Sequence, residues 1–290
     1  MFIDVHAHVY RKMGIKQDGG VFFMDPEELL RRHDELGIER ACILPLIGPE
    51  CYLPQSNEDI LDIARASNGR LIPFCNLDPR GLDNSPTSPF DYWLTYYRDQ
   101  GCKGIGEFMP NLAFGDPRVQ NFFQHAENVG LPLTFDISPR LGGRYGLYDE
   151  VGLPQLEASL RRFPKLVILG HGPAFWAEMG ILETPNDRDG YPPYPIHQEG
   201  VVPKLFRRYP NLYGDLSAGS GYNALARDPG HAVKFIHEFQ DRLLFGTDLC
   251  FKEQPARIVP FLLELRQSGK ISEAIFRKLA KENAVKLLGL

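Results

Sequence analysis

The chain alternates between short apolar runs and longer amphipathic stretches along its whole length. Eight runs rich in β-branched and other apolar residues predict strands at residues 2–8, 40–46, 71–77, 102–108, 131–137, 166–172, 212–217 and 243–249. Helical periodicity and capping residues predict helices at about 25–37, from 56 onward, and at about 91–100, 117–129, 154–163, 199–209, 229–239 and 255–267. Such alternation is typical of a parallel sheet.

The number and spacing of the predicted strands favour a closed barrel. Their ends recur every 29 to 38 residues, except for one gap of 46 residues between Gly172 and Ala218. A doubly wound sheet more often has five or six strands and a glycine-rich first turn, so the pattern predicts an α/β protein with a (β/α)8 TIM-barrel fold. The long gap predicts a lid-like insertion at about 173–198. An extra C-terminal helix from Ser272 to Leu288 completes a single domain over residues 1–290.

Composition narrows the partners and the compartment. The 290 residues include 32 basic and 37 acidic side chains, a net charge of −5, with no long run of either sign. This argues against binding nucleic acid or a membrane surface and leaves a small molecule as the expected partner. No apolar run reaches the roughly 18 residues of a membrane span, and a charge at residue 4 argues against a signal peptide. The five cysteines contain no Cys-x-x-Cys pair, which favours a reducing cytoplasm.

Metal-ligand side chains close five of the predicted strands. In a barrel of this kind the reacting groups lie at the carboxyl ends of the strands, so these residues should meet at one face. They are His6 and His8 on the first strand, Glu107 on the fourth, Asp136 on the fifth, His171 on the sixth and Asp248 on the eighth.

His6 and His8 are two residues apart on one strand, so their side chains point to the same face, together with Asp4. In a barrel that face is the interior. Two imidazoles that converge on one point suit a zinc-like divalent ion. The alternative is that one or both are buried histidines whose hydrogen bonds are satisfied within the protein.

Asp248 and His171 each follow an apolar strand and have glycine close by. Asp248 ends the sequence Leu-Leu-Phe-Gly-Thr-Asp, and its alternative role is the N-cap of a following helix. His171 lies in Leu-Gly-His-Gly, and its alternative is a buried histidine bonded to the backbone.

Glu107 and Asp136 are carboxylates at the ends of otherwise apolar strands. A buried carboxylate is costly without a partner, so we expect a metal ion or an arginine near each. Arg140 and Arg144 are the alternative partners for Asp136.

Taken together, these motifs resemble the amidohydrolase superfamily. The likeness rests on His6-x-His8, His171-Gly, Gly-Thr-Asp248 and the terminal segment 282–290, in the correct order over essentially the whole chain. It points to the amidohydrolase-related branch, which includes aminocarboxymuconate semialdehyde decarboxylase-like enzymes and lactone hydrolases. The resemblance implies a distorted barrel with one divalent ion, commonly zinc, held by residues matching His6, His8 and Asp248. It also implies a homodimer, which the branch often forms.

The chain departs from this family at the end of the fifth strand. The family usually has another histidine ligand there, whereas this sequence has Asp136. An aspartate ligand would favour manganese or magnesium more than histidine does. Alternatively, Glu107 supplies the missing ligand. We therefore expect zinc, with manganese or magnesium as alternatives.

Three functions are compatible with these residues. The first is a metal-dependent hydrolase in which a metal-activated water attacks a lactone, ester or amide. Asp248 then transfers the proton, and His171 or the metal stabilises the oxyanion. The second is a nonoxidative decarboxylase of a small unsaturated or aromatic acid, and the third is a barrel that has lost catalysis.

Four further residues are predicted to bind the substrate. Arg140 and Arg144 would hold a carboxylate, and Phe175 and Trp176 would form an aromatic wall. The alternatives are solvated surface arginines and aromatic side chains that pack the barrel rim.

Overall fold

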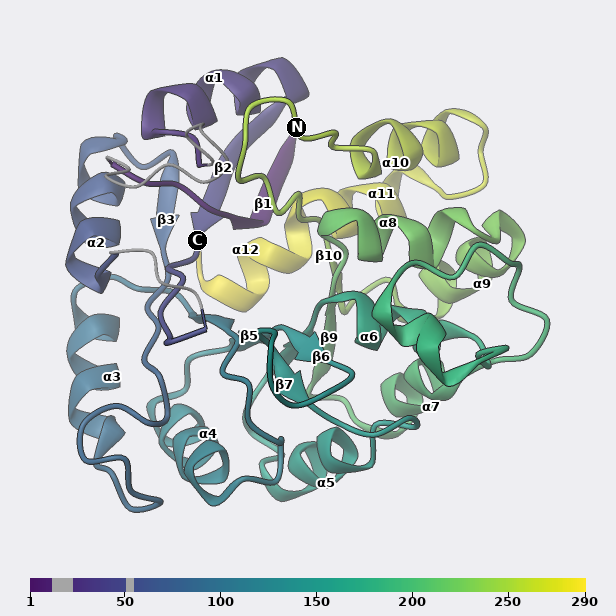
Figure 1. Cartoon of the computed structure of the whole chain (residues 1–290). Coiled ribbons are helices and arrows are strands. Elements are labelled where there is room, and N and C mark those ends of the chain that lie inside the picture. Colours follow the sequence, from purple (N-terminus) through teal and green to yellow (C-terminus); the bar gives the residue numbers. More distant parts are fainter. Residues whose placement is uncertain (12–22, 51–54) are drawn as a thin grey trace.

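Eight parallel strands form the centre of the protein in the computed structural model, which describes residues 1–11, 23–50 and 55–290 (Figure 1). All eight lie within the ranges predicted for them or overlap these closely, although most are shorter. They are β1 (Phe2–Ala7), β2 (Ile38–Ile43), β3 (Leu71–Pro73), β4 (Ile105–Phe108), β5 (Leu133–Phe135), β8 (Ile168–Gly170), β9 (Leu212–Asp215) and β10 (Leu243–Leu244).

The strands pair in the order expected of a barrel. One sheet has the order β1-β2-β3 and the other β10-β9-β8-β5-β4. Parallel bridges join the two sheets at both seams, between Cys75 and Ile105 and between Ala7 and Leu249. The first seam also has a hydrogen bond from the Cys75 N–H to the Gly104 carbonyl at 3.0 Å. These contacts confirm the predicted (β/α)8 barrel.

The eight predicted helices are all present, and Figure 1 shows most of them following one another around the outside of the strands. Local sequence explains their ends. Asp25 accepts a hydrogen bond from the Glu28 N–H at 2.9 Å, and Gly37 ends the first helix with a φ of 70°. The helices are α1 (Pro26–Leu36), α2 (Asn57–Ala66), α3 (Phe90–Asp99), α4 (Pro117–Val129), α5 (Pro154–Arg162), α7 (Val201–Arg208), α9 (Pro229–Phe239) and α10 (Ile258–Gln267).

Several short elements are additional to the prediction. The loop after β5 contains the small parallel pair β6 (Ile137–Ser138) and β7 (Leu147–Tyr148), and α8 (Ala218–Ala226) follows β9. The insertion holds α6 (Pro173–Trp176) and two 3-10 helices, η1 (Ala177–Met179) and η2 (Pro185–Asp189). Asp189 pairs with Arg140 and Arg144, so the insertion lies against the loop that follows β5.

The C-terminal segment packs against the barrel, as predicted. It is one continuous helical stretch made of α11 (Glu273–Arg277), the π-helical η3 (Lys278–Glu282) and α12 (Asn283–Leu288). Ala284 and Leu288 share a buried cluster with side chains from β1, β3, β8 and β10. The helix therefore contacts strands from both sheets of the barrel.

Four of the five cysteines lie in the described part of the chain, and all four are free: Cys42, Cys75, Cys102 and Cys250. Cys51 falls outside the described residues. Within those residues, no helix combines the length and the apolar character that crossing a membrane would require.

Candidate metal and catalytic site

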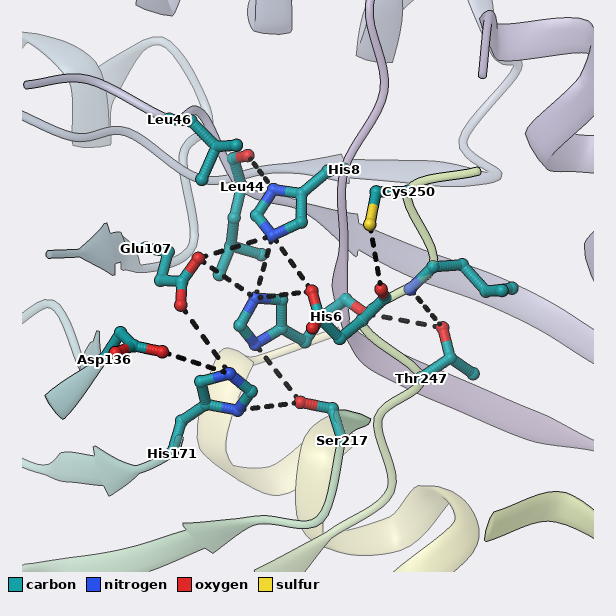
Figure 2. Close-up of polar contacts among 12 residues, drawn as sticks. His6, His8, Leu44, Leu46, Glu107, Asp136, His171, Ser217, Thr247 and Cys250 are labelled. Carbon is teal, nitrogen blue, oxygen red and sulfur yellow. Dashed lines mark hydrogen bonds and ion pairs between the residues drawn. The ribbon is translucent and has the colours of Figure 1, made fainter. Parts of the chain in front are cut away.

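Seven histidine, aspartate and glutamate side chains meet at the carboxyl ends of the barrel strands. Six of them are almost completely buried, whereas the Asp248 side chain is 23% exposed to solvent. Figure 2 shows His6, His8, His171 and Glu107 pointing toward one another. The full set, in chain order, is His6, His8, Glu107, Asp136, His171, Asp215 and Asp248.

Four donor atoms surround one position. The Nε2 atoms of His6 and His8 are 3.1 Å apart, and Asp248 Oδ1 lies 3.7 Å and 3.2 Å from them. Glu107 Oε2 lies 3.8 Å from His6 Nε2 and 3.5 Å from His8 Nε2. In a tetrahedral site with bonds of about 2.0–2.2 Å, neighbouring ligand atoms are roughly 3.3–3.6 Å apart. The five distances from the two histidine nitrogens, 3.1–3.8 Å, are close to this spacing and fit a single divalent ion.

Hydrogen bonds on the far side of each ring fix which nitrogen faces this position. His8 Nδ1 donates to the Leu44 carbonyl at 2.9 Å, and His6 Nδ1 donates to Asp215 Oδ2 at 2.6 Å. Each Nδ1 atom carries the hydrogen that its partner accepts. In the neutral rings, each Nε2 atom therefore keeps a lone pair. Two nitrogens that face two carboxylates favour a positive charge between them, which a bound metal ion can supply.

The pKa values of the site show how strongly it attracts positive charge. Burial lowers the pKa of His8, but the hydrogen bonds with Asp248 and Glu107 outweigh it and raise that pKa to about 9. For Glu107, burial raises the pKa, yet the bonds with His6 and His8 hold it well below the usual range. The cluster is therefore electrostatically suited to a bound cation.

Glu107 also faces a second group of side chains. Its Oε1 lies 3.6 Å from His171 Nε2, and Asp136 Oδ2 lies 3.9 Å from the same nitrogen. Glu107 is therefore near His6, His8 and His171, whereas Asp136 lies near His171. Burial, followed by the charges of Glu107 and Asp248, raises the pKa of Asp136 well above its ordinary value.

The structure decides between several alternatives from the sequence. Asp248 does not cap a helix, because the next helix begins at Ile258 with Arg257 before it. His171 bonds to the Ser217 hydroxyl at 3.0 Å. Arg140 and Arg144 pair with Asp189 and not with Asp136.

Asp215 is a member of the site that the sequence analysis missed. It ends β9 and contacts both His6 Nδ1 and, at 3.4 Å, His171 Nδ1. Burial raises the pKa of Asp215, but the charge of His6 and the bond with His171 hold it below the usual range. The signal was present, because Leu-Tyr-Gly-Asp places a carboxylate directly after an apolar strand, as at the other strand ends.

Backbone contacts join the ligand-bearing strands. Asp4 accepts hydrogen bonds from the His6 N–H at 3.0 Å and the Thr247 N–H at 2.9 Å. The Asp248 N–H donates to the His6 carbonyl at 2.7 Å, with a φ of 56° that aspartate tolerates better than most residues. These bonds set the position of Asp248 relative to His6.

The two aromatic residues predicted to face the substrate lie in the core instead. Phe175 is fully buried and fills the space left by Gly170, where an added Cβ would lie 2.3 Å from its ring. Trp176 is 1% exposed, and its indole N–H donates to the Asp215 carbonyl at 2.9 Å. Both side chains therefore pack the barrel and do not line a binding surface.

A cavity of about 460 Å³ opens next to the site. Asp136 forms part of its wall, together with Glu50, Arg144, Tyr145 and Arg188. Arg144 therefore borders the same cavity as Asp136, and its role in substrate binding stays a prediction. Arg140 does not line this cavity, and its side chain is 61% exposed.

Solved structures of similar fold cover the whole chain. An uncharacterised TIM-barrel protein from Bordetella bronchiseptica is 18% identical, with 99% of this chain and 98% of that chain covered and a TM-score of 0.68. A probable 2-pyrone-4,6-dicarboxylic acid hydrolase from Acinetobacter baumannii is 15% identical over 100% and 99% of the two chains, with a TM-score of 0.62.

A third structure, 2,6-dihydroxybenzoate decarboxylase from Rhizobium, is 16% identical over 99% and 98% of the two chains, with a TM-score of 0.58. At these identities the likeness establishes the fold. Comparison with curated proteins gives no match. The family model described as amidohydrolase matches residues 3–290, so the chain belongs to the amidohydrolase family, as its motifs indicated.

Proposed function

We propose that this chain is a metal-dependent hydrolase that acts on a small lactone, ester or amide. The observation that carries the proposal is that Glu107 Oε2 and Asp248 Oδ1 each lie 3.2–3.8 Å from the Nε2 atoms of both His6 and His8, which are themselves 3.1 Å apart. The Nδ1 atoms of both histidines bond elsewhere, which leaves the Nε2 atom of each ring to bind a metal. The name of the Acinetobacter neighbour, a probable hydrolase, agrees with this reaction type.

These four residues would hold the ion, and zinc is the ion we propose. Two imidazoles favour zinc, whereas the two carboxylates leave manganese or magnesium as alternatives. A divalent ion at this position supplies Lewis acidity, which polarises a carbonyl and makes water a stronger acid.

Asp248 is placed to move the proton. It is the most exposed carboxylate of the cluster, so one of its oxygens can face the substrate and an incoming water. When the water oxygen bonds to the carbonyl carbon, Asp248 accepts the proton that the water releases. The same proton passes to the leaving oxygen or nitrogen as its bond to that carbon breaks.

His171 is placed to stabilise the negative charge on the former carbonyl oxygen. Its Nδ1 faces the Ser217 hydroxyl at 3.0 Å and Asp215 at 3.4 Å, which orient the ring. Its Nε2 faces the Glu107 and Asp136 carboxylates. The ring is therefore held from both sides.

Nonoxidative decarboxylation is the second candidate, and Asp136 favours it. Burial and the nearby carboxylates raise the pKa of Asp136 well above its ordinary value, which favours the protonated carboxyl group. A neutral carboxylic acid in a buried site can protonate the carbon that loses CO2. The Rhizobium neighbour is named as an enzyme that performs such a reaction.

A single panel separates the two reactions. The zinc-, manganese- and magnesium-loaded proteins are incubated with lactones, esters, amides and unsaturated or aromatic acids, and both carbonyl hydrolysis and CO2 release are followed. Hydrolysis without CO2 release supports the proposal, and CO2 release from an acid supports the alternative.

Metal content tests the site itself. The purified protein should hold about one divalent ion per chain, and the double variant His6→Ala/His8→Ala should lose it. Exposed His197 provides the matched control, because His197→Ala should leave the ion in place. A metal-free native protein whose stability is unchanged by chelator would contradict the proposal.

Asp136 variants test whether the second group also binds metal. If Asp136 is a ligand, Asp136→His should retain or increase metal content and Asp136→Ala should decrease it. If the wild type and both variants held equal amounts of metal, Asp136 would not be a ligand. Its role would then be limited to substrate binding or proton transfer.

A further inference from the structure

The cavity beside the site connects the catalytic side chains with the insertion. Asp136 lies at one end, where its Oδ2 is 3.9 Å from His171 Nε2, and Arg188 of η2 borders the same space. Its volume of about 460 Å³ is within the range of small-molecule pockets. A substrate that reacts at the metal-ligand cluster can therefore extend into this cavity.

Arg188 is a buried arginine with an unused donor group. The residue is 2% exposed, its Nη1 donates to the Asp149 carbonyl at 2.9 Å, and its Nε lies 2.8 Å from Glu178 Oε1. Across the described ranges 1–11, 23–50 and 55–290, its Nη2 has no hydrogen-bond partner. An unpaired buried donor is costly, so an acceptor supplied by a ligand would be strongly favoured there.

Two guanidinium groups, those of Arg144 and Arg188, line this part of the cavity. Asp189 pairs with Arg144 and Glu178 with Arg188. Arg140 shares Asp189 but does not line the cavity.

Glu50 lines the cavity as well, but its charge is already compensated. Arg80 donates to both of its oxygens, at 2.6 Å and 2.7 Å, and the Asn111 N–H donates to one of them at 3.0 Å. Although burial raises the pKa of Glu50, the bonds from Arg80 lower it below the ordinary value. Glu50 is therefore held by Arg80 and is not the partner of Arg144 or Arg188.

We propose that Arg144 and Arg188 form a subsite for a carboxylate group of the substrate. The inference rests on the proposed function, because the subsite is useful only if the reaction takes place at the adjoining cluster. The Nη2 donor of Arg188 and the guanidinium of Arg144 border the same cavity, and guanidinium groups bind carboxylates with charge-assisted hydrogen bonds. The substrate class is then a carbonyl compound that also carries a carboxylate, and the insertion determines this specificity through Arg188.

Calorimetric titration with simple dicarboxylates tests the subsite. The zinc-loaded protein is titrated with succinate, glutarate and adipate and with the monomethyl ester of each. The wild type should bind the best-fitting dicarboxylate at least roughly tenfold more tightly than its monoester, as expected for one charge-assisted contact. Arg144→Met should reduce this preference to less than about twofold.

Arg140→Met is the matched control, because Arg140 shares Asp189 with Arg144 but does not line the cavity. It should retain the preference. Arg188→Met leaves buried Glu178 without its charged partner, so the double variant Arg188→Met/Glu178→Gln removes both charges and should also lose the preference. Folding of each variant is followed by thermal unfolding.

The outcomes separate this inference from the proposed function. A protein that holds zinc but binds dicarboxylates and monoesters equally, or in which Arg144→Met leaves the preference intact, overturns the subsite alone. A protein that binds no metal yet prefers dicarboxylates in an Arg144-dependent manner overturns the hydrolase proposal and leaves the subsite standing.

Discussion

His6 uses both of its ring nitrogens, and only Nε2 faces the proposed metal position. Its Nδ1 is 2.6 Å from Asp215 Oδ2, and both side chains are fully buried. A carboxylate bonded to the far nitrogen of a ligand histidine fixes the orientation of the ring and increases its basicity. Asp215 is therefore a positioning residue for His6.

We expect Asp215→Asn to weaken metal binding by roughly 10- to 100-fold. The neutral amide lacks the negative charge with which Asp215 makes His6 a stronger metal ligand. Competition with a chelating dye measures the affinity. Ser217→Ala removes a hydroxyl 3.3 Å from the same ring nitrogen and should have a smaller effect. An affinity that is unchanged in Asp215→Asn would contradict this role.

His33 is a buried histidine outside the site, and its pKa gives the fold a pH dependence. Burial, followed by the charge of Arg70, lowers this pKa to about 4, whereas the ordinary value is about 6.5. As the pH falls from 6.5 toward 4, the unfolded chain takes up a proton that the folded chain does not. The free energy of unfolding should therefore fall by an amount on the order of 3 kcal/mol over this range, with no effect above pH 7.

Urea unfolding of the wild type and His33→Gln between pH 7.5 and 4.5 measures this contribution. The variant should lose less stability than the wild type as the pH falls. Asp4 lies 3.7 Å from His33, and burial raises its pKa to about 7, but Asp4 titrates in both proteins. The exposed His237→Gln serves as the control. Parallel curves for wild type and His33→Gln would refute the prediction.

The sequence predicted the direction of a side chain correctly where its position at the end of a strand alone determines that direction. His6, His8 and Asp248 follow this rule, and the structure brings their donor atoms together. Phe175 and Trp176 do not, because their directions depend on spaces left by glycines on neighbouring strands. Gly170 makes room for Phe175 and Gly214 for Trp176, and such three-dimensional complementarity cannot be deduced from spacing.

At the scale of elements, glycines at strand ends allow the strands to bring their acidic side chains close together. A Cβ on Gly246, just after β10, would lie 2.6 Å from Asp215 Oδ1 and 3.4 Å from His6 Cβ. The missing side chain thus leaves the space that the pair of Asp215 and His6 occupies. The glycine close to Asp248 in the sequence therefore makes room inside the barrel.

Gly246→Ala should displace Asp215 and lower both stability and metal affinity. An added methyl group in a packed core typically costs about 1–3 kcal/mol. Gly190 is the matched control, because an added Cβ there meets no atom within 4 Å among the described residues. Thermal unfolding and metal titration of the two alanine variants should differ clearly, and equal behaviour would contradict the packing argument.

The alternation of strands and helices was predictable because it depends on local periodicity and caps. The Ser56 hydroxyl and Asp59 carboxylate exchange hydrogen bonds with each other's backbone, as their spacing indicated. Helix α8 was missed because it carries Gly219 and Gly221, which are poor helix formers. Their role is tertiary, since Gly221 packs against the Leu216 backbone and Gly219 against Tyr191.

At the scale of the whole molecule, the proposed metal ion would join strands that are far apart in sequence. Its ligands come from β1, from β4 and from the segment after β10, so the site exists only when both sheets of the barrel are assembled. The same centre concentrates the carboxylates of Glu107, Asp136, Asp215 and Asp248. A bound cation would both connect the strands and reduce the repulsion among these groups.

Metal binding should therefore stabilise the whole domain and not only the site. An ion at about 100 times its Kd adds roughly 2.7 kcal/mol to the free energy of unfolding, which for a chain of this size raises Tm by about 5–10 °C. Calorimetric scans with zinc and with chelator measure this shift. In His6→Ala/His8→Ala the shift should disappear, whereas in His197→Ala it should persist. If zinc stabilised the double variant as much as the wild type, the ion would be binding elsewhere. The assignment of the strand ends as its site would then be wrong.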